Sequence, residues 1–336
     1  MYILGYIDPN SQLPSLLTLP NAYQTTLFAR NLTRSFGGAV IIPDLSLKLK
    51  RGEVLGLLGH NGAGKTTTLQ MLTGCLTPDS GQIEICGLDL NKTPALAKTH
   101  LGYLPETPPL YRELPVETYL SFTAKLRRMD ATRISAALKT TLQRCGLESV
   151  RKKTISTLSK GYQQRVGIAQ AIIHSPDVII LDEPTIGLDP VQIRDIRDLI
   201  RELGNTSSVI LSTHLLSEVE SVCDRVEIMQ KGRLIYSDSS LRMQHYDQRL
   251  GYVISLRHPP ELCELENLAG ITSVEKISPT QFRLYHAPGD NPGDMLLDLA
   301  TQRGWQLEQL TPLHHSLEDV FSKITGDECV SSETQK

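Results

Sequence analysis

The nine residues GHNGAGKTT at positions 59–67 have the types and spacing of a phosphate-binding loop. Glycines 59, 62 and 64 let the backbone turn tightly, so that its N–H groups face a phosphate. Lys65 supplies a positive charge toward the β- and γ-phosphates, and the Thr66 hydroxyl is a ligand for Mg²⁺. We therefore assign to nucleotide binding Gly59, His60, Asn61, Gly62, Ala63, Gly64, Lys65, Thr66 and Thr67, with Thr66 also a metal ligand.

A pair of carboxylates follows an apolar run in VIILDEPTIGLDP, residues 178–190. Asp182 at the end of a buried strand is placed to hold Mg²⁺, since ligands of doubly wound sheets bind at the carboxyl ends of the strands. Glu183 then lies where it could orient an attacking water and accept its proton. Adjacent acids after a strand are also common in solvated turns, but four aliphatic residues directly before them favour the catalytic interpretation.

The segment LSKGYQQRVGIAQA, residues 158–171, begins as a turn and continues with helical spacing. Ser159 and Gly161 at its start combine a hydroxyl, an unobstructed backbone and a helix N-terminus, which together favour an anion. Ser159 could instead serve only as the helix cap.

Positioning these groups requires an α/β fold. The runs 53–59, 177–184 and 207–214 are continuously apolar, as expected for central parallel strands covered on both faces. The run 66–74 has helical spacing, and residues 110–175 read as a mostly helical insertion. In the tail, alternation predicts strands at 252–258, 273–278 and 281–287, and helical spacing marks 292–304 and 316–326. We predict three parts: an N-terminal extension (1–26), a nucleotide-binding domain (27–236) and a small α+β domain (237–336).

The composition is that of a folded globular protein, with 336 residues, 40% apolar and 21% charged. No apolar run approaches the ~20 residues that span a bilayer. The six cysteines show no metal or redox spacing, and the start lacks the charges of a secretory signal, so we expect a cytoplasmic protein. Residues 121–165 carry 11 Lys and Arg against two acids, which is either a solvated face or a surface for anionic headgroups or a partner.

LSKGYQQR resembles the signature of the ATP-binding-cassette ATPases, usually written LSGGQ, and lies just upstream of the strand that ends in Asp182, as in that family. The resemblance implies an ABC-type P-loop ATPase core with a helical subdomain. It further implies that Ser159 and Gly161 face the γ-phosphate held by a second subunit, so that two chains close over two ATP molecules.

The resemblance carries over to four more positions. Phe36 matches the aromatic residue that stacks on adenine, although an ordinary strand residue would look the same. Asp189, in GLDP, matches the loop that couples the two sites, and His214 matches the switch histidine that contacts the γ-phosphate; a strand-end histidine can also be structural. Glu106 stands where most of the family has a metal-binding glutamine; its carboxylate still ligates Mg²⁺ but adds negative charge near the phosphates.

Lys160 and Tyr162 depart from the usual signature. Together with LPE around Glu106, they resemble the exporter-type subgroup (ABC-2-like, drug or gliding type), whose ATPases power a separately encoded membrane permease. The resemblance therefore implies an ATPase with ATP and Mg²⁺ as cofactors, which pairs with a second ATPase subunit, usually a second copy, and sits on the inner face of the cell membrane. The permease forms the pathway, so the transported substrate stays open.

The alternative is a soluble, non-transport ABC ATPase of translation or DNA repair. Such relatives show two cassettes, long coiled coils or a zinc hook, whereas this sequence has one phosphate loop, no sustained heptads and no C-x-x-C. A P-loop kinase would have no use for the signature segment. An isoelectric point near 6.3 gives no overall attraction to nucleic acid, and we expect no such partner, although the basic 121–165 stretch keeps one possible.

Overall fold

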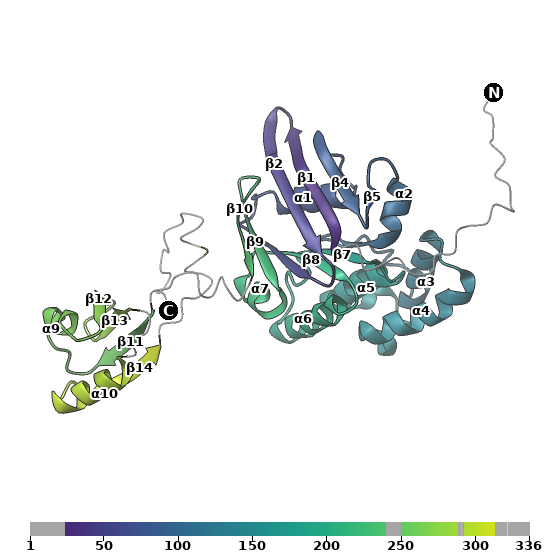
Figure 1. The fold of residues 1–336 in the computed structure, drawn as a ribbon. Coiled ribbons are helices and arrows are strands. Elements are labelled where there is room, and N and C mark those ends of the chain that lie inside the picture. The colour runs from purple at the N-terminus through teal and green to yellow at the C-terminus, as the bar shows by residue number, and fades with distance from the viewer. Residues whose placement is uncertain (1–23, 240–249, 288–289, 291, 313–320, 322–336) are drawn as a thin grey trace, which may run out of the picture.

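The computed structural model describes residues 24–239, 250–287, 290, 292–312 and 321. Residues 24–239 pack as three layers, and residues 250–312 form a separate small unit (Figure 1). No helix in the described ranges combines the length and the apolar character needed to cross a bilayer. The fold thus agrees with the predicted α/β core and small α+β tail.

The central layer is a six-stranded sheet in the order β10-β9-β3-β8-β7-β6. Neighbouring strands from β9 to β6 run parallel, and β10 closes the edge as an antiparallel partner of β9. Ile179 and Leu181 pack on one face of the sheet and Ile180 on the other, which explains the continuous apolar run. The strands are β3 (Val54–Leu58), β6 (Leu101–Leu104), β7 (Val178–Asp182), β8 (Ser208–Thr213), β9 (Arg225–Gln230) and β10 (Arg233–Ser239).

A four-stranded antiparallel sheet covers one face of the central sheet together with α1. Its order is β2-β1-β4-β5. The alternating burial of β2, with Leu45, Leu47 and Leu49 inside, is that of a sheet with one face in water. Its strands are β1 (Thr25–Phe36), β2 (Ala39–Lys50), β4 (Ser80–Ile85) and β5 (Leu88–Asp89).

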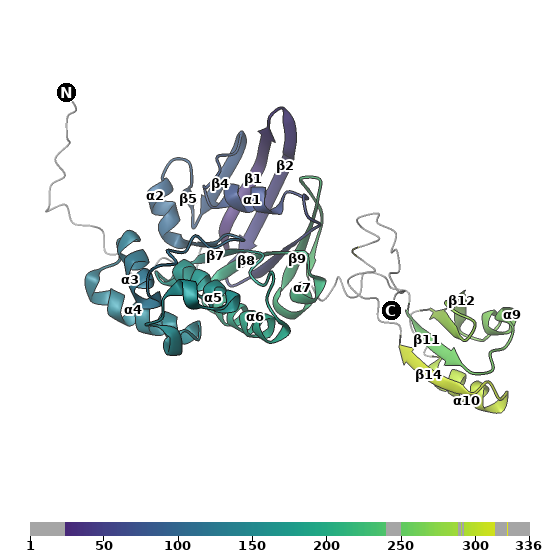
Figure 2. The same ribbon diagram turned by 180° about the vertical axis from the view of Figure 1, so that it is seen from behind.

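Helices cover the opposite face, and α3, α4 and α5 form the predicted helical insertion (Figures 1 and 2). α4 begins at an Asp130 cap, whose carboxylate accepts the Thr132 N–H, and α6 begins with a proline behind an Asp189 cap. The helices are α1 (Lys65–Leu72), α2 (Pro94–Ala97), α3 (Val116–Leu126), α4 (Ala131–Arg144), α5 (Lys160–Ile172), α6 (Pro190–Gly204) and α7 (Leu216–Val222), with 3₁₀ turns η1 (Lys98–His100), η2 (Glu148–Val150) and η3 (Ile155–Thr157).

The small unit is an antiparallel sheet in the order β12-β13-β11-β14 with its own core, built around Phe282 and Trp305. The tail strands and the 292–304 helix appear as predicted, and β14 was not anticipated. Its elements are β11 (Leu250–Leu256), α9 (Leu262–Glu266), β12 (Ile271–Lys276), β13 (Gln281–His286), α10 (Gly293–Gln302) and β14 (Leu307–Pro312).

Parts of the predicted organisation fall on other residues. The N-terminal extension lies outside the described residues up to position 23, and β1 already begins at Thr25. The predicted helix 316–326 also lies outside them, apart from Phe321. Residue 236, the predicted end of the nucleotide-binding domain, falls inside β10, which pairs with β9 through Ser239.

Candidate active site

The loop between β3 and α1 has the backbone that its glycines predict. Gly62 and Gly64 adopt φ values of 81° and 106°, which side chains other than glycine rarely tolerate. A Cβ atom on Gly59 would lie 2.5 Å from the carbonyl oxygen of Met229 on β9. The loop therefore holds its backbone against the sheet and opens directly into the N-terminus of α1, the geometry that suits an anion.

Lys65, the first residue of α1, is buried rather than solvent-facing, with 6% of its side chain exposed. Its Nζ donates a hydrogen bond to the Gly59 carbonyl oxygen at 2.7 Å and lies 3.3 Å from Oε1 of Glu183. Because both groups are buried, solvent screens the attraction between the ammonium group and the carboxylate only weakly. Lys65 thus links the phosphate loop to the end of β7.

Asp182 ends β7 and is fully buried. Burial raises the pKa of its carboxyl group, the hydrogen bond from Ser212 and the nearby Thr66 hydroxyl lower it, and the charges of Glu183 and Glu106 raise it further. The Ser212 hydroxyl donates to Oδ1 at 2.5 Å, while Oδ2 has no hydrogen-bond partner within the described structure. A buried carboxylate oxygen without a donor, surrounded by a hydroxyl and another carboxylate, fits a hard divalent cation such as Mg²⁺.

Glu183 follows with φ 47°, a left-handed conformation that strains a residue with a side chain. Its N–H donates to the Ser212 hydroxyl at 3.0 Å, which helps to hold it there. Oε2 lies 2.9 Å from Nδ1 of His214, just beyond the end of β8. Glu183 is therefore held between two residues: Oε1 faces the Lys65 ammonium group, and Oε2 faces the His214 ring.

Two contributors to this cluster were missed by the sequence reasoning. Ser212 lies directly across the β7–β8 ladder from Asp182, a pairing that follows from two neighbouring parallel strands. Glu218 is buried on α7 and hydrogen-bonds to the Thr185 hydroxyl, which fixes the turn after Glu183. A carboxylate within an amphipathic helix gave no signal in the sequence.

The signature segment packs against the turn that precedes α6. Ser159 caps α5, with its hydroxyl 3.5 Å from the Tyr162 nitrogen, so this hydroxyl has a capping role within one chain. A Cβ atom on Gly161 would lie 2.4 Å from the Gln192 side chain. Gly187 has φ 68° and is approached by the Lys160 ammonium group. These contacts give Gly161 a packing reason within one chain, and the replaced signature residue Lys160 covers the GLDP turn.

The remaining predicted residues come from three other segments. Phe36 is 45% exposed at the end of β1 and carries the Arg34 guanidinium at 4.7 Å from its ring centroid, which leaves aromatic surface available. Asp189 caps α6 by accepting the Gln192 N–H at 2.9 Å. The His60 ring lies against that of Phe321, with ring centroids 4.9 Å apart and the planes tilted by 49°, a contact that the sequence did not predict.

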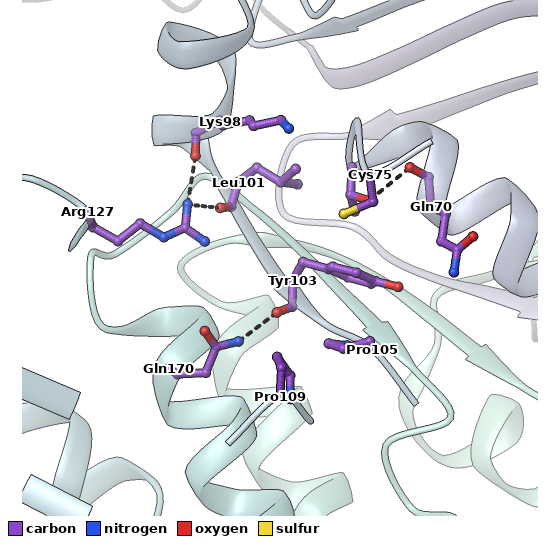
Figure 3. A pocket seen from close by; sticks show the side chains of 10 residues that line it. Gln70, Cys75, Lys98, Leu101, Tyr103, Pro105, Pro109, Arg127 and Gln170 are labelled. Carbon is purple, nitrogen blue, oxygen red and sulfur yellow. Dashed lines mark hydrogen bonds between the residues drawn. The ribbon is translucent and has the colours of Figure 1, made fainter. Parts of the chain in front are cut away.

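A cavity of about 450 Å³ lies beside the site, between α1, β6, α5 and the end of α3. Figure 3 shows Tyr103 in this cavity with Pro105 and Pro109 nearby and Gln170 reaching its backbone carbonyl. The Tyr103 hydroxyl is buried and has no hydrogen-bond partner among the described residues. Arg127 donates hydrogen bonds to the carbonyl oxygens of Lys98 and Leu101. Its guanidinium group thereby holds one wall of the cavity together.

Comparison with known proteins identifies the relatives of this chain. Residues 42–186 match the family model described as ABC transporter. The chain is 35% identical to an ABC transporter ATP-binding protein of Bacillus subtilis, over 90% of this chain and 97% of the other. It is 33% identical to the bacitracin transport ATP-binding protein of Bacillus licheniformis, over 90% and 98% of the two chains. A solved ATP-binding subunit of an ABC transporter superposes with a TM-score of 0.61 at 31% identity, over 66% of this chain and 93% of that one.

Proposed function

Because this chain belongs to the ATP-binding subunits of ABC transporters, we propose that residues 59–67, Asp182, Glu183 and His214 form the site that hydrolyses its ATP. The family binds and hydrolyses ATP to power transport, and the comparisons give no support to a role in translation or DNA repair. The observation that carries the assignment is the chain of contacts from the buried Lys65 through the buried Glu183 to the more exposed His214.

Phosphate binding falls to the loop and to Lys65. The backbone N–H groups of residues 59–67 and the start of α1 face the β-phosphate, and the Lys65 ammonium neutralises charge on the β- and γ-phosphates. Thr66 and Asp182 would hold Mg²⁺, with Glu106 beside them, and Mg²⁺ would supply charge neutralisation between the phosphates. The exposed face of Phe36 would stack on adenine.

Glu183 acts as the general base in this proposal. Its carboxylate would orient a water molecule for attack on the γ-phosphorus and accept one of its protons. A γ-phosphate would compete with Glu183 for Lys65, so nucleotide binding would loosen one of the two contacts that hold the carboxylate. His214 keeps the other, 2.9 Å from Oε2, and would sense the γ-phosphate at the same edge of the sheet.

A second subunit completes the site. The Ser159 hydroxyl, the Gly161 backbone and the α5 N-terminus would contact the γ-phosphate of a second copy of the chain, and Asp189 would couple the two sites. Lys160, which lies over Gly187, links the signature segment to the turn that leads to Asp189.

The membrane partner would dock at the helical insertion. Tyr111, Phe122 and Leu126 are 49%, 38% and 64% exposed around α3, and the cavity that contains Tyr103 lies next to them. An exposed apolar surface beside a hollow with a free hydroxyl suits a segment of a permease, and the basic residues of 121–165 suit the headgroups around it. The chain would thus sit on the inner face of the cell membrane.

Export is the direction that the relatives favour. One relative is named for bacitracin transport and another, from Bacillus subtilis and 36% identical over 62% of this chain, for linearmycin resistance. A transporter that confers resistance moves its substrate away from the cell interior.

The assignment is tested with Lys65→Ala. Loss of the cation should lower the rate of ATP hydrolysis by at least about 100-fold, the scale for removing one preorganised group that stabilises transition-state charge. Phosphate release by the purified chain measures the rate, and thermal melting shows that the variant is folded. Lys92→Ala is the matched control, because Lys92 is 79% exposed and pairs with Asp89 far from the loop. A folded Lys65→Ala chain that keeps the wild-type rate would refute the site.

A further inference from the structure

Outside the active site, Cys86, His100 and Asp177 bring a thiol, an imidazole and a carboxylate together. One ligand atom from each residue lies within 4.8 Å of the other two. The His100 Nδ1 lies 2.7 Å from Oδ2 of Asp177, so two of the three groups already share a hydrogen bond. All three side chains are partly buried.

The fold forces this convergence from three distant segments. Leu101 on β6 pairs with Val178 on β7, so the residues one position earlier, His100 and Asp177, stand side by side at the strand starts. Cys86 comes from the turn between β4 and β5 in the antiparallel sheet. These positions lie at the opposite ends of β6 and β7 from Asp182, and the cluster is therefore separate from the nucleotide site.

The turn that presents Cys86 is an unusual place for a cysteine. Cys86 and Gly87 connect Ile85 to Leu88 with φ values of 49° and 76°, both positive, as in a type I′ hairpin. Asparagine or aspartate normally fills the first of these positions, because its short polar side chain tolerates the left-handed region. The turn alone does not account for a thiol there.

We propose that Cys86, His100 and Asp177 bind a zinc ion, with water as the fourth ligand. Sulfur, nitrogen and oxygen donors in one site select a borderline-soft transition ion, whereas Mg²⁺ and Ca²⁺ take oxygen ligands. Zinc takes the place of the proton that Nδ1 of His100 shares with Asp177; the neutral imidazole then carries its one proton on Nε2, and the Cys86 thiol proton passes to solvent as the thiolate binds. Arg51, 63% exposed and 4.0 Å from Oδ1 of Asp177, balances the second carboxylate oxygen.

Zinc here would act as a clamp. Cys86 belongs to the antiparallel sheet, whereas His100 and Asp177 lead into the central sheet. The ion would tie the two layers together at the edge away from the nucleotide, and its binding free energy would stabilise the folded chain.

Zinc titration of the full-length chain, without nucleotide, tests the proposal. In competition with a chromophoric chelator, the wild-type chain should hold one zinc ion, and Cys86→Ser or His100→Asn should weaken binding at least about tenfold. Zinc should raise the melting temperature of the wild type and not that of the two variants. Cys75→Ser and His258→Asn are matched controls at exposed positions and should behave as the wild type.

Cobalt gives a second, spectroscopic readout, whose main result is obtained on the wild-type chain. Cobalt bound to the wild-type chain should show a thiolate-to-metal charge-transfer band in the near ultraviolet, and zinc should abolish it. Absence of that band, its persistence in Cys86→Ser, or equal loss of zinc binding in the control variants would overturn the proposal. None of these measurements depends on ATP hydrolysis, so their failure leaves the nucleotide site untouched.

Discussion

At the scale of single residues, the candidate site works by leaving buried groups with fewer partners than they need. Asp182 is fully buried with one oxygen bonded to Ser212 and the other without a donor. Such a group destabilises the folded chain unless a cation or a proton compensates it. A binding site for Mg²⁺ placed there gains affinity from relieving that cost, which is why the orphaned oxygen supports the proposed metal ligand.

His174 is another buried polar group, and its burial makes the stability of the folded chain depend on pH. Its pKa is lowered to about 4, mainly by burial and further by the Arg127 charge, although Nε2 bonds to the Leu101 carbonyl. Between pH 6.5 and pH 4 the unfolded chain therefore binds a proton that the folded chain does not, and stability falls as the pH falls. From pH 7.5 to pH 5 this group should cost about 2 kcal/mol.

His174→Gln should remove this dependence. Urea unfolding at pH 7.5 and pH 5 would measure it, with His258→Gln, an exposed histidine, as the control. The loss of stability between the two pH values should be about 2 kcal/mol smaller in His174→Gln than in the control. The same loss in both variants would contradict a depressed His174 pKa.

At the scale of elements, the sequence predicts those parts of the site that depend on one strand and its next turn. The phosphate loop, Asp182 and His214 all follow apolar runs, and each run is a strand in the structure. Ser212 opposite Asp182 was within reach, because it needs only the pairing of two predicted strands. The order of the strands in the sheet could not be predicted, since it depends on packing between layers.

Contacts between distant elements left no local signal. Gly161 lies against Gln192 of α6, and Cys86 meets Asp177 across two sheets. Neither pair shares a motif, because each depends on how layers stack rather than on the spacing within a helix or strand. Periodicity therefore predicted helices and strands, and the motifs predicted the loop at 59–67 and the carboxylates after β7, but neither could predict these contacts between layers.

The exposed apolar patch on and before α3 is the surface where we expect the membrane partner to dock. Leu126→Glu places a charge in the exposed apolar patch with Tyr111 and Phe122, and should reduce membrane recovery of the chain when its permease is co-expressed. ATP hydrolysis by the purified chain should stay within about twofold, because surface substitutions of this kind change stability little. Membrane fractionation followed by immunoblotting measures the effect.

Leu297→Glu provides the matched control, since Leu297 is also an exposed leucine on a helix, 46% exposed on α10. It should leave membrane recovery unchanged. Equal recovery of the two variants would show that the α3 patch is not the docking surface.

At the scale of the whole molecule, the chain has an ATPase core that is complete in its layers and a second unit with a separate apolar cluster. Phe321, far along the sequence from the phosphate loop, is buried against the core, and its ring lies next to that of His60 in the loop. The loop proposed to bind nucleotide therefore also contacts Phe321. This pair of aromatic rings links the 59–67 loop to the C-terminal part of the chain.

Because the proposed nucleotide site is completed by a second chain, we expect nucleotide to control dimerisation. Glu183→Gln keeps the size of the side chain and removes the base, so ATP with Mg²⁺ should bind, close two chains together and not be consumed. Because ATP then belongs to the interface, the dimer should be stable only in its presence. Size-exclusion chromatography with light scattering should show a dimer with ATP and a monomer without it. Adding Ser159→Arg, which fills the phosphate-facing start of α5, should return the double variant to a monomer, whereas Arg at the exposed position of Lys92 should not. A mass that ignores nucleotide in every variant would mean that the signature segment serves only to cap its own helix.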